Sequence, residues 1–132
     1  MLQTSRTANM TGAVGELPLE ISSWREGNAL FLALRGDVDL RTVRDLRHAI
    51  ADGLKDNACT ELVADMSRVL FVDSSGYGAF LGAMQSLRLR GGGRVHLVCC
   101  QPAVARMLTI IRLHNVFAIH DSLEQAREAL RR

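Results

Sequence analysis

Residues 69–78 read VLFVDSSGYG, an apolar run that ends at an aspartate and is followed at once by two serines and a glycine. Beyond this segment, large apolar side chains recur at helical spacing over residues 75–90 and predict a helix. A buried strand that leads directly into a helix forms a corner, and we expect this corner to present Ser74 to solvent. The simplest role for Asp73, Ser74 or Ser75 there is to cap the helix by accepting its free amide hydrogens.

The segments on either side of this corner alternate between strands and helices. The expected strands cover residues 19–24, 29–34, 61–66, 95–100 and 116–119, and the expected helices begin near residues 41, 75, 102 and 123. The order ββαβαβαβα predicts a single α/β domain with a mixed, mostly parallel five-stranded sheet and about four helices. We expect this domain over residues 18–132, preceded by a flexible tail over residues 1–17.

The composition is that of one globular domain. The chain has 132 residues, 48% hydrophobic and 23% charged, with a net charge of +2. Such a balance gives no strong electrostatic attraction for phosphate groups, so direct nucleic-acid binding is not expected.

No apolar run approaches the roughly 20 residues of a membrane-spanning helix, and no secretion signal is visible, so we expect a cytoplasmic protein without a membrane span. The three cysteines suit neither a disulfide framework nor paired metal ligands and are expected to be buried or inert.

The serines of the corner do not lie in a hydrolase motif. A nucleophile elbow requires G-x-S-x-G, but Val72 stands two residues before Ser74, and Asp73 stands two residues before Ser75. Neither a dinucleotide-binding fingerprint nor a phosphate-binding loop occurs, so no cofactor is expected.

Metal ligation has equally little support. Asp37 and Asp39 are separated by one residue but have no histidine or further carboxylate nearby in the sequence, and capping of the next helix is the simpler role for Asp39. The histidines show no ligand spacing; they are His48, His96, His114 and His120. We therefore expect neither a metal site nor an enzyme.

Several motifs together resemble a known family. They are GDVD at residues 36–39, DMS at 65–67, FVDSSG at 71–76, GGGRVHLV at 91–98, and the stretch 102–113 followed by Phe117. This combination resembles the STAS domains of bacterial anti-sigma factor antagonists, over residues 19–132. The resemblance implies that Ser74 is phosphorylated by a partner anti-sigma factor with serine-kinase activity. From the residues alone, Ser74 and Ser75 are both open as acceptors.

The same resemblance implies a partner switch. An unphosphorylated protein of this kind binds the anti-sigma factor and frees a sigma factor, the phosphorylated form lets go, and a PP2C-type phosphatase resets it. The residues expected to contact the partner are Asp37, Asp39, Asp73, Ser75, Gly76 and Tyr77. Tyr77 stands where the family most often has an aliphatic residue, and it fits equally an exposed contact or a half-buried helix residue. The alternative with the same fold is a STAS-like scaffold subunit of a stress-signalling or lipid-transport complex, in which the serine is never phosphorylated.

Two further patterns concern the helices. Arg41, Arg44 and Arg47 form a basic stripe on the first helix, which is either a solvated face or a surface for an acidic partner or nucleic acid. The helix after the serines carries little side-chain bulk in its first turns, because glycine and alanine fill residues 76, 78, 79, 82 and 83. A helix this thin is able to pack close to a sheet.

Overall fold

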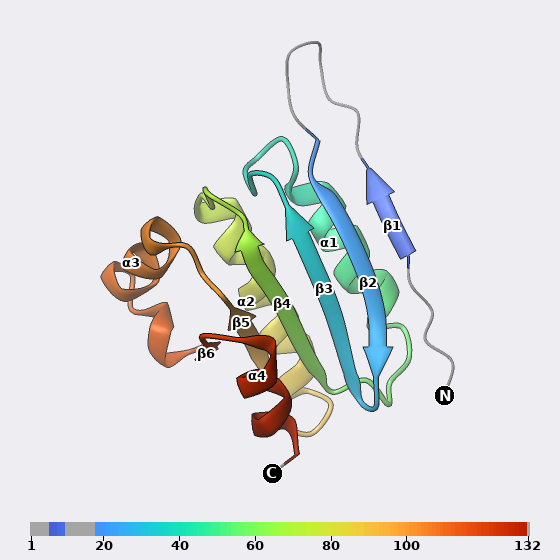
Figure 1. Ribbon diagram of the computed structural model, residues 1–132. Coiled ribbons are helices and arrows are strands. Elements are labelled where there is room, and N and C mark those ends of the chain that lie inside the picture. The colour runs from blue at the N-terminus through green and yellow to red at the C-terminus, as the bar shows by residue number, and fades with distance from the viewer. Residues whose placement is uncertain (1–5, 10–17, 132) are drawn as a thin grey trace.

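A six-stranded sheet forms the centre of the structure, a computed structural model that describes residues 6–9 and 18–131 (Figure 1). The strands follow chain order across the sheet; they are β1 (Arg6–Asn9), β2 (Glu20–Glu26), β3 (Ala29–Arg35), β4 (Glu61–Arg68), β5 (Val95–Val98) and β6 (Ala118–His120). β2 is antiparallel to both of its neighbours, β1 and β3, and the strands from β3 to β6 are parallel. The helices are α1 (Val43–Gly53), α2 (Ser74–Arg88), α3 (Pro102–Ile110) and α4 (Leu123–Leu130), with a 3-10 turn, η1 (Leu113–Asn115), after α3.

The hairpin between β2 and β3 closes through two residues, Gly27 and Asn28. Glu26 pairs with Ala29, and Gly27 has a φ of +60°, in the left-handed region that glycine reaches without strain. The parallel strands that follow are joined through helices, as parallel pairing requires.

Helices cover both faces of the sheet (Figure 1). The larger core cluster lies between the sheet and α1 and α2, and includes the fully buried Leu32, Leu62 and Phe80. A smaller cluster on the opposite face lies under α4, where Phe31 and Val63 pack with Ala126. β3 and β4 are covered on both faces, and β3 is accordingly apolar except for its last residue. In β4 the continuously apolar part is shorter and covers the buried residues 62–64.

The predicted α/β class, strand order and four helices are confirmed, and the sheet has one strand more than expected. Residues 6–9, which we expected to belong to a tail, form β1 and pair antiparallel with β2, with Arg6 opposite Ser23. The sequence RTAN has no apolar alternation, so this edge strand depends on main-chain hydrogen bonds that the pattern does not reveal. The remaining residues of the predicted tail lie outside the described residues.

Candidate functional site

The predicted corner is present, and Asp73 is the N-cap of α2. Asp73 has an extended backbone, and its Oδ1 accepts hydrogen bonds from the backbone N–H groups of Ser75 (2.9 Å) and Gly76 (3.2 Å). The same oxygen accepts a hydrogen bond from the Ser75 hydroxyl. These bonds satisfy amide donors that have no partner within the helix, so the Asp73 side chain fixes where α2 begins.

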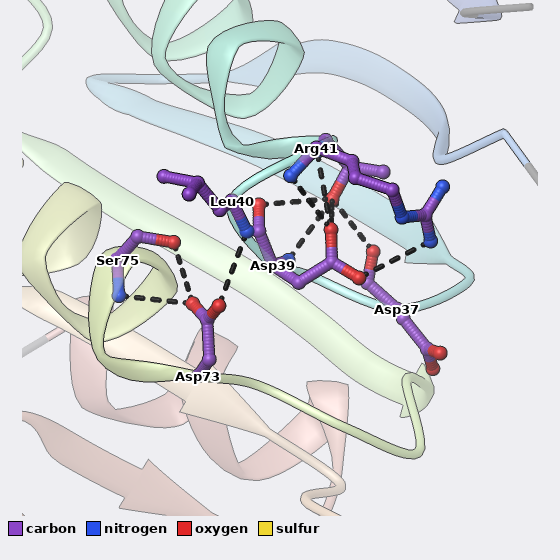
Figure 2. A network of polar contacts seen from close by, with 7 residues as sticks. Asp37, Asp39, Leu40, Arg41, Asp73 and Ser75 are labelled. Carbon is purple, nitrogen blue, oxygen red and sulfur yellow. Dashed lines mark hydrogen bonds and ion pairs between the residues drawn. The ribbon is translucent and has the colours of Figure 1, made fainter. Parts of the chain in front are cut away.

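The other carboxylate oxygen of Asp73 ties the corner to the loop after β3 (Figure 2). Oδ2 accepts a hydrogen bond of 3.1 Å from the backbone N–H of Leu40, 33 residues earlier in the chain. Beside it, Val38 and Val72 form an isolated parallel bridge. The Val38 N–H donates to the Phe71 carbonyl (2.9 Å), and the Asp73 N–H donates to the Val38 carbonyl (3.0 Å). The loops that follow β3 and β4 are therefore held together at one edge of the sheet.

Asp39 organises the loop that faces the corner. Its Oδ1 accepts hydrogen bonds from the N–H groups of Arg41 (2.9 Å) and Thr42 (3.3 Å), and its Oδ2 forms an ion pair of 3.1 Å with the Arg41 guanidinium. The Thr42 hydroxyl donates to the Asp37 carbonyl (2.8 Å). Asp39 thus closes the turn that leads into α1, whereas the Asp37 carboxylate is exposed and points away from the other labelled side chains (Figure 2).

The edge formed by these loops is negatively charged. The pKa of Asp73 is lowered, first by the hydrogen bond from the Ser75 hydroxyl and further by those from the backbone N–H groups, against the opposing effect of desolvation. Asp73 is therefore an anion near neutral pH. Asp37 and Asp39 lie on the adjacent loop, and Arg41 balances part of this charge.

The two serines of the corner differ in exposure and in bonding. Ser74 is the first residue of α2 and is exposed, and its hydroxyl makes no hydrogen bond within residues 18–131. Ser75 is half-buried, and its hydroxyl is engaged with Asp73. Of these two hydroxyls, only that of Ser74 is exposed and has no hydrogen-bond partner in the described residues.

Comparison with known proteins identifies the family. The model of the STAS domain matches residues 21–126. This chain belongs to the STAS domain family. The anti-sigma F factor antagonist of Paenibacillus polymyxa is 28% identical over 105 residues, which cover 79% of this chain and 88% of that protein. The resemblance drawn from the sequence motifs is thereby confirmed.

Solved structures share the fold of this STAS domain. The anti-sigma factor antagonist SpoIIAA in its unphosphorylated form matches with a TM-score of 0.73 at 24% identity, over 84% of this chain and 96% of that chain. An anti-sigma factor antagonist from Mycobacterium paratuberculosis matches with a TM-score of 0.69 at 22% identity, over 98% of this chain and 96% of that chain.

Two of the residues expected to contact the partner of this STAS domain, Gly76 and Tyr77, are buried. A Cβ on Gly76 would stand 2.6 Å from Val72 Cγ1 and 2.8 Å from Val38 Cγ1, so glycine is needed for α2 to approach the bridge. Tyr77 is 4% exposed and belongs to the larger core, and its burial, together with nearby Cys100, raises the pKa of its phenol to about 12. Both residues are buried beneath the corner and fix its position.

Three large apolar side chains that the sequence interpretation did not single out are exposed at this edge. Leu40 is 79% exposed, Leu70 is 69% exposed and Phe71 is 51% exposed. The hydrogen bonds made by the Leu40 N–H and the Phe71 carbonyl place these two residues close to Asp73. We call these three residues the apolar rim. Leu70 and Phe71 look like strand core in the sequence, because they belong to the apolar run 69–72, which follows the end of β4.

The described residues add two findings about other functions. No group of three or more histidine, cysteine, aspartate or glutamate side chains in them has the arrangement to hold a metal ion. None of the helices found in residues 18–131 combines the length and the apolar character needed to cross a membrane.

Proposed function

We propose that this STAS domain is an anti-sigma factor antagonist whose binding is switched at Ser74. Unphosphorylated, it binds an anti-sigma factor that has serine-kinase activity, and a sigma factor is released. Phosphorylation of Ser74 by that partner ends the binding, and a PP2C-type phosphatase restores it. In this proposal the domain acts in the cytoplasm, binds no nucleic acid directly and has no catalytic activity of its own.

The observation that carries the proposal is the state of the Ser74 hydroxyl. It is exposed at the start of α2 and has no hydrogen-bond partner in the described part of the chain, whereas the Ser75 hydroxyl is held by Asp73. A kinase requires an acceptor that it can reach without opening the fold. The relatives are consistent with this reading: one is an anti-sigma F factor antagonist, and SpoIIAA has been solved in unphosphorylated and phosphorylated forms.

The apolar rim supplies the contact surface. Exposed leucine and phenylalanine side chains around a polar centre are suited to burial in a protein interface, where a few anchors contribute most of the affinity. Asp37 and Asp39 surround this surface with negative charge and favour a partner with a basic patch.

Phosphorylation changes the charge of this surface much more than its shape. A phosphate on Ser74 adds nearly two negative charges next to the anionic Asp73. A partner that buries this edge then meets like-charge repulsion and a large desolvation cost, together about 3 kcal/mol or roughly a hundredfold in affinity. A loss of that size is sufficient for an on/off switch.

The proposal is tested by retaining partners from the native cytoplasm on wild type, Ser74→Ala, Ser74→Asp and, as matched control, Ser75→Ala. Mass spectrometry identifies both the retained proteins and the phosphopeptide. We expect a kinase-type anti-sigma factor on wild type, Ser74→Ala and Ser75→Ala but not on Ser74→Asp, with phosphate on Ser74 alone. The same large assembly on all four baits, without phosphate, would replace the switch by the scaffold function.

A further inference from the structure

A groove runs between α1 and α2, which lie side by side on one face of the sheet (Figure 1). Its volume is about 390 Å³. Its floor is formed by four buried residues: Ile50 of α1, Leu54 directly after α1, and Ala79 and Ala83 of α2. None of the side chains that line it is acidic. The groove does not include Ser74, the apolar rim or the loop after β3.

Three cations stand along the walls of the groove, at Arg47, Lys55 and Arg90. Arg47 is exposed, and its side chain makes no ion pair or hydrogen bond within the described chain. Its Nη2 lies only 3.7 Å from where a Cβ of Gly78 would stand, so the guanidinium crosses toward α2. Lys55 pairs with Asp52 at 3.3 Å, and Asp52 lies outside the lining.

Arg90 is a fixed cation rather than a mobile one. Its guanidinium donates to the backbone carbonyls of Asp56 and Cys59, each at 3.1 Å, and to that of Leu54. These neutral acceptors hold the side chain in place without cancelling its charge. Arg90 and Lys55 thus mark one end of the groove and Arg47 the other.

Two glycines of α2 are required neither by backbone conformation nor by close packing, and one of them, Gly82, lines the groove. A positive φ accounts for Gly27, Gly36, Gly91 and Gly92, and close contacts to a Cβ account for Gly53, Gly76 and Gly93. Gly78 and Gly82 remain: each lies inside a helix, one turn apart, and a Cβ on Gly82 would meet nothing within 4 Å. Alanine there would strengthen the free helix. At Gly82 the missing side chain leaves open space in the groove, which a group from outside the chain can fill.

We propose that this groove is a docking site for an acidic amphipathic helix of a partner protein. The furrow between two adjacent helices receives the ridge of a third. The apolar floor fits an apolar stripe on that helix, and cations at both ends fit Asp or Glu residues flanking the stripe. A bilayer surface is flat and does not reach a recessed floor, so the shape favours a helix over a membrane. The site lies apart from Ser74 and does not depend on the proposed switch.

The test uses the full-length, isotope-labelled chain and a synthetic helical peptide of about 18 residues, with Leu and Ala on one face and Glu flanking it. A peptide with Lys in place of Glu is the control ligand. Binding is followed through backbone amide shifts. We expect the Glu peptide to shift the amides of Ala51, Gly82 and Ser86, and the Lys peptide to leave them unchanged.

Variants separate docking from folding. Arg47→Glu is expected to weaken the Glu peptide by about tenfold, whereas Arg106→Glu on the exposed face of α3 leaves it unchanged. Gly82→Leu is expected to abolish binding by filling the groove. Gly82→Ala is expected to raise the midpoint of thermal unfolding and yet to weaken binding, a combination that structural damage does not produce.

Three results would overturn the proposal. The first is a set of amide shifts that maps outside the groove, and the second is binding of the Glu peptide that neither Gly82→Leu nor Arg47→Glu weakens. The third is co-sedimentation with phosphatidylglycerol vesicles that depends on Gly82 and Arg47, observed while the Glu peptide does not bind. Phosphorylation at Ser74 is scored separately in the same variants, so failure of the groove and failure of the switch are distinguishable.

Discussion

Replacement of Asp73 by alanine tests the residue that caps α2 and connects it to the loop after β3. The change removes the cap of α2 and the tether to the Leu40 N–H at 3.1 Å. Loss of an N-cap costs about 1 kcal/mol, and loss of a partly exposed hydrogen bond to a charged acceptor costs about 1 kcal/mol more. We therefore expect a loss of about 2 kcal/mol, which lowers the melting temperature by about 6–10 °C in a chain of this length. Asp73→Asn keeps a neutral acceptor for the cap but presents an NH₂ group or a weaker acceptor to Leu40, and is expected to lose about half as much.

Urea unfolding at several pH values measures this loss, and amide exchange at Leu40 and Gly76 locates it. The folded pKa of Asp73 is lowered, so its contribution is complete above the unfolded value near 4 and disappears as the pH falls through the folded pKa. The difference between wild type and Asp73→Asn should therefore shrink in acid. Two results would refute the reasoning. One is a free energy of unfolding of Asp73→Ala within about 0.5 kcal/mol of that of wild type, and the other is a stability difference between wild type and Asp73→Asn that does not change with pH.

Three further perturbations probe other parts of the domain. Gly76→Ala puts a Cβ 2.6 Å from Val72 Cγ1 and should cost about 1–3 kcal/mol in urea unfolding, whereas Gly82→Ala should gain about 0.5–1 kcal/mol; equal effects would contradict the packing argument. Phe71→Ala removes a side chain that is half exposed and should change stability by less than about 1 kcal/mol while weakening the retained anti-sigma factor at least about tenfold; unchanged retention would exclude Phe71 as an anchor. Burial and the neighbouring His96 lower the pKa of His120, so the unfolded chain takes up this proton at a higher pH than the folded chain. Stability should fall as the pH drops below about 6.5, and His120→Gln should flatten that part of the profile, as monitored by thermal unfolding; an unaltered slope would assign the effect to other groups.

The elements with a clear apolar pattern could be predicted from the sequence. The strands β3 to β5 contain short continuous apolar runs, α1 and α2 have apolar residues at helical spacing, and the corner at Asp73 followed from an apolar run meeting polar residues. The edge strand β1 could not be predicted in this way, because RTAN has no large apolar side chain and no apolar alternation, and it pairs through its backbone.

The candidate site was predictable only in its local part. The cap by Asp73 joins neighbours in the sequence, whereas the bond to Leu40 joins two loops that meet only after the sheet has formed. The burial of Tyr77 had a signal: it stands three residues before Phe80 and seven before Met84, on the apolar face of α2. The exposure of Phe71 had none, because the pattern of an apolar run does not show where the chain leaves the sheet.

Several independent contacts fix the backbone around Ser74, and they bear on how the proposed switch works. The Asp73 cap, the bridge between Val38 and Val72, and the close fit of Gly76 each fix the same backbone. The start of a helix also tolerates added negative charge, so a phosphate at Ser74 has little reason to rearrange the corner. A partner then meets a preformed surface in both states, with little ordering cost on binding, and distinguishes the states by charge and hydration. We therefore expect α1 and α2 to keep their positions, and the groove between them to retain its shape, whichever state Ser74 is in.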